Sequence, residues 1–366
     1  PASDVTRLDL CLIPVAPSCV KILVHTPCNS AGLKEIQMID RRFRAIAVPV
    51  VALVAMAAAA TSAAGQSTPW GDPDLQGTWT SSGATPMERP DQFAGRDKLS
   101  DEEVSSIRAQ TTARDLELLN APAQRTEVGT NPGAYNNFWM DRGARTNRTS
   151  MLIDPPSGKF PPLTPAGEQH SKNQLKAPGG MEKDDTWEDR HIWERCVTRG
   201  GMPNAMFPRS YNNNMQVFQA PGVVVMLIEQ VHEVRVVPID DRPQVSDKIT
   251  QWNGLSRGHW EGDTLVVETA NLDDRVSALQ PWSLFSSHQG SGKELTLVER
   301  FTRVAPGTLE YEVEVNDPLM YTDSWTVNYP FTQMDDLIYE YACHEGNHGM
   351  EGILSGGRAE DLAAGK

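Results

Sequence analysis

Two histidines near the C-terminus have the spacing of a zinc site. Residues 344–348 read His-Glu-Gly-Asn-His, the pattern in which two imidazoles one helical turn apart bind zinc and the glutamate activates water. The pattern needs a helix, whereas here it follows a predicted strand and contains Gly346, and a glycine costs about 1 kcal/mol in a helix interior. A metal-dependent hydrolase centred on His344, with His348 as a second ligand of a divalent metal, is therefore an alternative hypothesis.

Two cysteines predict a disulfide. Cys343 precedes His344, but adjacent residues of a strand point to opposite faces, so this pair is badly placed for thiol chemistry. Of the five cysteines in the chain, Cys196 and Cys343 follow the predicted signal peptide described below. In an oxidising compartment they would form one disulfide, with two buried free thiols as the alternative.

Glutamates on apolar strand faces are the second kind of candidate. Glu299 shares a predicted face with leucines and a phenylalanine, and Glu340 shares one with Ile338 and Ala342. A buried carboxylate is costly without a cation or a hydrogen-bond donor. The cations that could accompany it are Arg235, Arg257, Arg300 and His232. Such a cluster could bind a polar group of a ligand or act as general acid and base; a structural ion pair, or a face assigned one residue out of register, is the alternative.

The candidate site residues follow from these patterns. Asn213 lies in a run of three asparagines, which usually forms side-chain-to-backbone turns, and Trp260 is one of several tryptophans that are usually core residues. Together they could instead bind a sugar, because aromatic rings stack on pyranose rings. The catalytic candidates are Glu299, Glu340, His232 and His344. The ligand-binding candidates are Arg235, Arg257, Asn213 and Trp260.

Alternating apolar and polar residues predict a β-sheet after Asn214. We expect seven strands, at residues 223–229, 234–239, 264–269, 295–304, 309–315, 324–329 and 337–343. Their short connections suit antiparallel neighbours, and closure into a barrel removes exposed edges. Gly77-Thr78-Trp79 resembles the opening of lipocalin-like barrels and could supply an early strand. The predicted fold is therefore mainly β, an antiparallel lipocalin-like barrel, with an antiparallel sandwich as the rival.

The part that precedes the sheet is predicted to be rich in helices and loops. Ser100 and Glu103 form a capping box, which predicts a helix over residues 100–119. Two further helix starts are predicted, one at Thr164-Pro165 and one at Asp185 with Glu188. Residues 66–211 are accordingly a helix- and loop-rich N-terminal portion, and residues 212–366 are the barrel.

Residues 38–65 have the pattern of a secretory signal peptide: three arginines, an apolar run over residues 45–60 and a cluster of small residues. The run is shorter than the roughly 20 residues of a bilayer span, so we expect no stable membrane span after cleavage, with a retained anchor as the alternative. A signal peptide acts at the start of a chain, so residues 1–37 are predicted to be a translated non-coding extension. The predicted location is secreted or periplasmic.

Charge excludes one class of function. The chain has 33 basic and 48 acidic residues, a net charge of -15, whereas a protein that follows a nucleic-acid backbone needs a positive surface. We therefore expect no nucleic-acid partner. After the signal peptide the sequence has no nucleotide-binding glycine loop, nucleophile elbow or haem attachment motif, so we expect no organic cofactor.

Four segments resemble a family of uncharacterised secreted bacterial proteins. They are Arg195-Cys196-Val197-Thr198-Arg199, residues 256–269 (SRGHWEGDTLVVET), residues 299–303 (ERFTR) and residues 339–347 (YEYACHEGN). The resemblance covers most of the chain after the signal peptide and implies a shared fold and export, but no activity, cofactor or catalytic residue. Members of that family often have tyrosine at the position of His348, which counts against a metal role for this residue.

The sequence thus predicts an exported barrel that encloses a small, partly apolar molecule. It would act either as a binding protein or as an acid/base enzyme, a hydrolase, isomerase or lyase, that needs no cofactor. Two alternatives stay open: the metal-dependent hydrolase centred on His344, and a glycan-binding module of the cell envelope.

Overall fold

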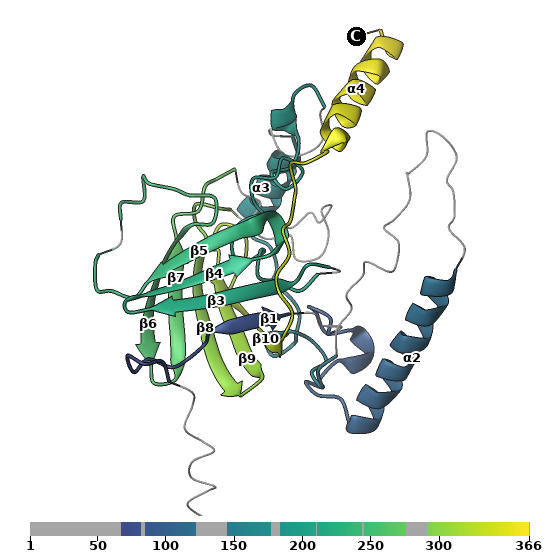
Figure 1. Cartoon of the computed structure of the whole chain (residues 1–366). Coiled ribbons are helices and arrows are strands. Elements are labelled where there is room, and N and C mark those ends of the chain that lie inside the picture. Colours follow the sequence, from purple (N-terminus) through teal and green to yellow (C-terminus); the bar gives the residue numbers. More distant parts are fainter. Residues whose placement is uncertain are drawn as a thin grey trace, which may run out of the picture. The chain divides into compact units, whose positions relative to one another are not determined.

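The strands form one antiparallel sheet that nearly closes into a barrel (Figure 1). The computed structural model describes residues 67–81, 85–121, 145–176, 184–209, 211–243, 245–275 and 291–365, which belong to one compact unit. Within these residues the strands are β1 (Gly77–Thr80), β2 (Leu152–Asp154), β3 (Asn214–Ala220), β4 (Val223–Ile228), β5 (Glu233–Pro238), β6 (Leu255–Glu261), β7 (Thr264–Ala270), β8 (Thr296–Ala305), β9 (Thr308–Asn316) and β10 (Trp325–Met334).

The strand order is β5-β4-β3-β1-β10-β9-β8-β7-β6, and β2 pairs with β10. The predicted mainly β fold with an antiparallel barrel is confirmed, and a single sheet takes the place of the two sheets of a sandwich. The predicted early strand at Gly77-Thr78-Trp79 is β1, which lies between β3 and β10.

Alternation positions the side chains in the way that the sequence predicted. In β9 the apolar residues Leu309, Tyr311, Val313 and Val315 are fully buried, while the glutamates between them lie on the outer face, half-buried or exposed. Each apolar residue faces a buried partner on β10, for example Val313 opposite Val327. One face of the sheet therefore forms the barrel core.

The barrel closes between β5 and β6, a junction that we call the seam. Nine strands lie around the barrel and every hydrogen-bonded neighbour is antiparallel, so the first and the last strand must run parallel. A parallel bridge between Ile239 and Gly258 joins them. Gly258 permits this approach, because a Cβ there would lie 2.6 Å from Ile239 Cδ1 and 2.9 Å from Val237 Cγ1.

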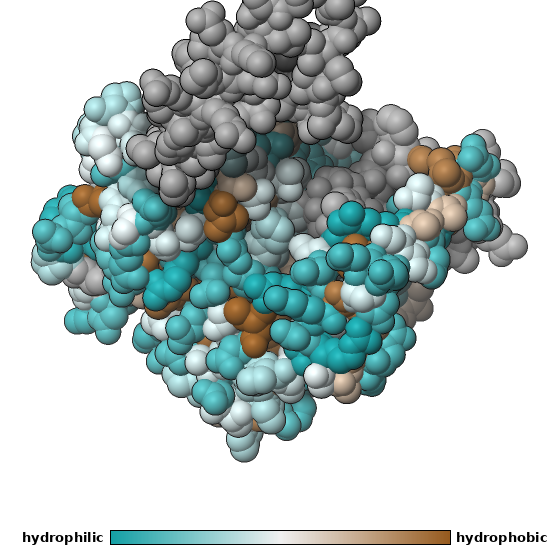
Figure 2. All heavy atoms as spheres, turned by 90° about the horizontal axis from the view of Figure 1, so that it is seen from below, coloured by the Kyte–Doolittle hydropathy of each residue, from teal (hydrophilic) through white to brown (hydrophobic). Residues whose placement is uncertain are grey.

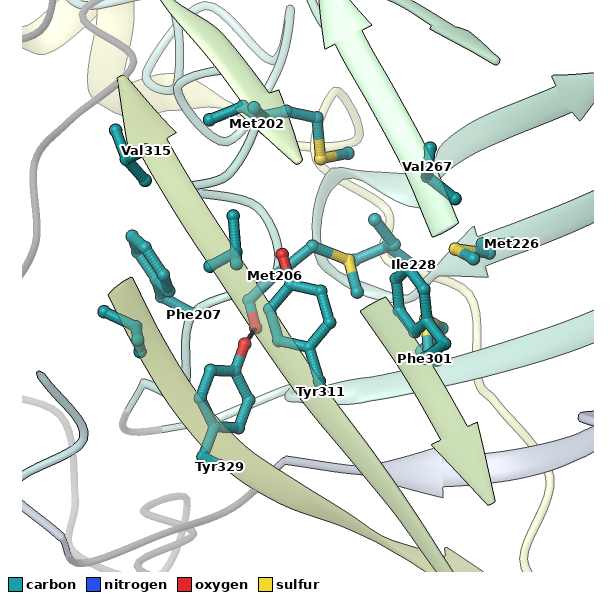
Figure 3. Packing of buried hydrophobic residues seen from close by; sticks show 14 of the residues in the cluster. Met202, Met206, Phe207, Met226, Ile228, Val267, Phe301, Tyr311, Val315 and Tyr329 are labelled. Carbon is teal, nitrogen blue, oxygen red and sulfur yellow. Dashed lines mark hydrogen bonds between the residues drawn. The ribbon is translucent and has the colours of Figure 1, made fainter. Parts of the chain in front are cut away.

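The barrel interior is filled by the chain itself. Met202, Met206 and Phe207, from the N-terminal portion, are almost fully buried against residues of the sheet. Figure 3 shows the Tyr329 hydroxyl beside the Met206 carbonyl, to which it donates a hydrogen bond at 2.5 Å. These side chains are therefore part of the packed core of the barrel.

The helices α2 (Asp101–Asn120) and α3 (Pro165–Lys176) begin where the sequence predicted. Ser100 and Glu103 form the predicted capping box, and the Thr164 hydroxyl accepts a hydrogen bond from the Gly167 N–H at 2.8 Å. The third predicted start is a short 3-10 helix, η3 (Trp187–Asp189), capped by Thr186 and Asp189 rather than by Asp185 and Glu188. The remaining helices in the described ranges are η1 (Asp91–Phe93), η4 (Gln230–His232) and α4 (His348–Ala363).

The predicted strand over residues 337–343 is wrong, because this segment has no strand conformation. Pairing of β10 with β9 ends at Thr332 and its pairing with β1 ends at Met334, so the chain beyond has no ladder to join. Leu337 and Tyr339 are each 75% exposed. Conversely, β2, β3 and β6 were not predicted as strands.

The predicted upstream extension and signal peptide lie outside the described residues. Among the residues that are described, none of the helices combines the length and the apolar character that crossing a membrane requires.

Candidate binding cleft at the barrel seam

A cleft of about 720 Å³ lies along the seam. Strand β5 forms one wall, and the other comes from the chain that connects β5 to β6 together with the start of β6. Its apolar lining residues are Val197, Val234, Val236, Pro238, Val245, Trp252 and Leu255. Its charged lining residues are Arg235, Arg257, Asp273 and Arg275. The remaining lining residues are Thr250, Gln251, Asn253, Gly254 and Ser256.

The parallel seam explains why a cleft forms here. Consecutive antiparallel strands can be joined by a two-residue turn, but consecutive parallel strands need a long crossover. Residues 239–254 make this crossover between β5 and β6, and part of it stands beside β5 and lines the cleft. Glu233 of β5 joins this crossover to the segment around Thr198, because its carboxylate accepts hydrogen bonds from Asn253 Nδ2 at 2.9 Å and Thr198 Oγ1 at 2.5 Å.

A buried ion pair lies at the base of the cleft. Arg235 lines the cleft, and its Nη1 donates a hydrogen bond to Glu299 Oε1 at 2.9 Å while Nη2 contacts Oε2. The Tyr311 hydroxyl donates to Glu299 Oε1 at 2.7 Å, and Thr269 Oγ1 donates to Oε2 at 3.3 Å. Arg235 Nε also donates to Ser256 Oγ across the seam at 3.0 Å. Each Glu299 oxygen therefore has two donors.

Burial and charge fix the protonation of this cluster. Glu299 is fully buried. Burial opposes the charge of Arg235, but the adjacent Glu299 carboxylate outweighs it and raises the pKa of the guanidinium. Burial, together with the Glu299 charge, raises the pKa of Tyr311 well above its usual value, so its hydroxyl stays a donor. The arrangement is that of a satisfied structural ion pair.

Two further arginines lie at the cleft, each beside a carboxylate. Arg257 Nη1 donates to Asp240 Oδ1 at 2.7 Å, and the exposed Arg242 binds the other oxygen of Asp240. Hydrogen bonds from Arg242 and the charge of Arg257 lower the pKa of Asp240. Arg275 binds both oxygens of Asp273 at 2.8 Å, and its guanidinium lies 4.5 Å from the centre of the Trp252 ring.

The structure brings together only part of the predicted site. Glu299 and Arg235 meet in the barrel as the charge argument predicted, and Arg257 lines the same cleft as Arg235. The expectation that Glu340 faces the barrel interior is wrong, because its segment is not a strand and the residue is exposed. His232 is also exposed, with its Nδ1 3.1 Å from the Tyr341 carbonyl oxygen.

Asn213 and Trp260 lie away from the cleft lining. Asn213 exchanges side-chain-to-backbone hydrogen bonds with Arg209, at 2.7 and 2.6 Å, which is the turn that such asparagine runs usually form. Trp260 is half-buried and packs against the barrel core.

The histidine motif does not form the helix that zinc binding in this pattern requires. Residues 344–346 lie in a bend and a turn, Asn347 is the N-cap, and α4 begins at His348. In the described part of the chain no group of three or more His, Cys, Asp or Glu side chains could hold a metal ion. The predicted disulfide between Cys196 and Cys343 is confirmed.

Sequence reasoning missed a buried histidine near the disulfide. His191 is 2% exposed, and its Nδ1 accepts a hydrogen bond from the Trp193 backbone N–H at 3.2 Å. Burial first, and then the charges of four arginines, lower its pKa to about 4. These arginines are Arg209, Arg199, Arg190 and Arg195. His191 stands directly after Arg190 and four residues before Arg195, but nothing in the sequence pattern marks it as buried.

We predict that His191 makes the protein less stable as pH falls. An unfolded histidine binds a proton below about pH 6.5, whereas the folded His191 stays neutral down to about pH 4. In that window the unfolded state binds more protons, so the free energy of unfolding falls as pH drops, by about 3 kcal/mol over the whole window. Urea unfolding at several pH values measures this slope. The slope of the unfolding free energy against pH should be shallower for His191→Gln, and an equal slope in both proteins would contradict the prediction.

The chain matches no protein-family model, no curated protein and no solved structure. Its function is therefore inferred from the geometry of its own residues.

Proposed function

We propose that the protein is an exported β-barrel protein that binds a small, partly apolar molecule in the cleft at its seam. The observation that carries this proposal is the cleft itself: its volume of about 720 Å³ falls within the roughly 300–1,000 Å³ of small-molecule sites. Apolar side chains and a few polar groups share its lining, the combination that binds the body of a ligand and orients it. The predicted signal peptide and the disulfide support export.

The surface supports a cleft as the place of binding. On the face seen in Figure 2, hydrophobic residues form small separate groups within a mostly hydrophilic surface. In the cleft, by contrast, Val234 and Val236 lie on the same face of β5 and are 58% and 54% exposed. Apolar area that a protein leaves open in a concave site is typical of ligand binding.

Binding explains the site better than catalysis does. A general base must reach the substrate within hydrogen-bond distance, but Glu299 is fully buried and its carboxylate accepts bonds from Arg235, Tyr311 and Thr269. His232, Glu340 and His344 are exposed and do not line the cleft. The acid and base that the enzyme hypothesis needs are therefore not found together at this site.

A dye-binding experiment tests the proposal. N-phenyl-1-naphthylamine, a neutral apolar dye, should gain fluorescence with the protein. Replacing both Val234 and Val236 by glutamine should weaken its binding by about tenfold or more, because burying a valine is worth roughly 1.5 kcal/mol or more. Phe218→Gln is the matched control, since Phe218 is a 47% exposed residue of β3 outside the cleft. No fluorescence gain with the unaltered protein, or the same loss in the control, would overturn the proposal.

A further inference from the structure

We infer that the ligand of the cleft is an amphiphilic anion: a compact apolar body that carries one carboxylate, sulfonate or phosphate group, held by Arg257. This inference rests on the proposed function, and it adds the charge of the ligand and the residue that recognises it.

Arg257 is the arginine of the cleft lining that has no carboxylate of its own. Arg235 pairs with Glu299 and Arg275 with Asp273, whereas Arg257 shares the single carboxylate of Asp240 with Arg242. Asp241 and, opposite Arg257 on β7, Glu268 are further acids nearby, but the ion pairs of the described residues join neither of them to Arg257. An anionic group of a ligand is therefore the partner that suits this guanidinium.

Arg257 also has N–H groups that can donate hydrogen bonds to a ligand. A guanidinium has five N–H groups in a fixed planar arrangement, which suits carboxylate, sulfonate and phosphate oxygens. Among the described residues, Arg257 donates one hydrogen bond, from Nη1 to Asp240 at 2.7 Å. Its side chain is 19% exposed, so Asp240 holds it in place while part of the group stays open to the cleft. Such preorganisation lowers the cost of binding a ligand.

The apolar wall lies on the same side of the seam as Arg257. In β6 the residues before and after it, Ser256 and Gly258, face the buried Thr269 and Val267 across β7, so Arg257 points to the outer face. In β5 the buried Arg235 and Val237 alternate with the exposed Val234 and Val236. The outer faces of β5 and β6 therefore present apolar and cationic groups side by side, as an amphiphilic anion requires.

The one acid of the lining does not favour a cationic ligand. Asp273 is 16% exposed at its side chain, and Arg275 contacts both of its oxygens. Hydrogen bonds from Arg275 lower the pKa of Asp273, so the carboxylate stays charged and already has its cation. A cationic ligand would have to displace Arg275, which also packs on Trp252.

Two dyes with the same ring system test the inference. 8-Anilinonaphthalene-1-sulfonate carries a sulfonate, and N-phenyl-1-naphthylamine is neutral. We expect the unaltered protein to bind the anionic dye more tightly, and added salt to weaken binding of the anionic dye alone. Arg257→Gln should weaken binding of the anionic dye about tenfold, as expected for loss of one charge-assisted contact, and leave binding of the neutral dye unchanged.

Arg242→Gln is the matched control. Arg242 binds the same Asp240 carboxylate, but its side chain is 68% exposed and it does not line the cleft, so neither dye should lose affinity. Three results would overturn the inference. The unaltered protein could bind both dyes with equal affinity, Arg257→Gln could lose affinity for both dyes equally, or Arg242→Gln could lose as much affinity for the anionic dye as Arg257→Gln does. The proposed function would still stand in those cases, because it fails only if the neutral dye does not bind or if Phe218→Gln weakens its binding as much as the double valine variant does. Should Arg257→Gln fail to fold, the salt dependence with the unaltered protein decides the question.

Discussion

Replacing Arg235 by methionine should lower the free energy of unfolding by about 3–5 kcal/mol, the usual loss when one partner of a buried ion pair is removed. The variant leaves the Glu299 carboxylate fully buried without the guanidinium that contacts both of its oxygens. Hydrogen bonds from Tyr311 and Thr269 remain, but they do not neutralise the charge. Urea unfolding at about pH 7 measures the loss.

The pH dependence separates loss of charge balance from loss of packing. Without Arg235, no cation balances the charge of the buried Glu299 carboxylate, a cost to the folded variant that a bound proton would remove. Its stability deficit relative to the unaltered protein should therefore shrink as pH falls from about 7 towards about 5. A deficit that is the same at every pH would contradict this explanation.

The double variant Arg235→Met/Glu299→Leu is the control. It removes both charges and keeps apolar volume in the core, and such replacements are often neutral. We expect it to regain most of the stability that Arg235→Met loses. If the double variant were as unstable as the sum of the two single variants, the pair would not interact in the way that the structure indicates.

The ion pair of Glu299 shows which part of the candidate site could be predicted from the sequence and which could not. A glutamate at an inward position of an alternating strand is a local signal, so its burial could be predicted. The choice among the four candidate cations could not, because β5 and β8 lie on different sides of the seam in the strand order. Their approach depends on closure of the whole barrel, and no pairwise pattern in the sequence encodes that register.

The cleft could not be predicted for a related reason. It exists because β5 and β6 are parallel, which follows from the odd number of strands around the barrel. The sequence pattern missed β3 and β6, and it added a strand at residues 337–343 that the fold does not form. In β6 the inward positions hold Ser256, Gly258 and Trp260 rather than aliphatic residues, and at Gly258 the close approach of Ile239 and Val237 leaves no room for a larger residue.

The residues that fill the barrel interior could not be predicted from the sequence either. Met202, Met206 and Phe207 belong to a segment of turns without regular alternation, so no period marks them as core residues. Methionine fills irregular spaces well because its side chain is unbranched and flexible. Side chains of the protein itself therefore lie in the interior that the sequence predicted to be a container, and the proposed function places the ligand at the outer side of the seam instead.

Removal of the disulfide should cost about 2–5 kcal/mol of stability. Cys196 and Cys343 are 147 residues apart, and a bond that closes so long a loop restricts the unfolded chain strongly. The bond also holds the segment after β10, whose other contacts include the one between His232 and the Tyr341 carbonyl and a hydrogen bond from Asn347 to the Glu194 carbonyl at 3.3 Å. In Cys196→Ser/Cys343→Ser we expect a lower urea midpoint and faster proteolysis between residues 335 and 347.

A reductant is the matched control for this pair of substitutions. It should shift the urea midpoint of the unaltered protein to that of the double variant, and it should have no effect on the variant itself. An unaltered protein whose midpoint and cleavage pattern do not change on complete reduction would show that packing alone holds the segment. Because Cys196 is 6% exposed, reduction should require partial opening of this region, so its rate should rise with urea before the main transition. Cys196 directly precedes Val197, which lines the cleft, and Thr198, which binds Glu233 of β5. The disulfide would therefore stabilise this part of the seam, and its loss should weaken dye binding in the cleft as well as lower stability.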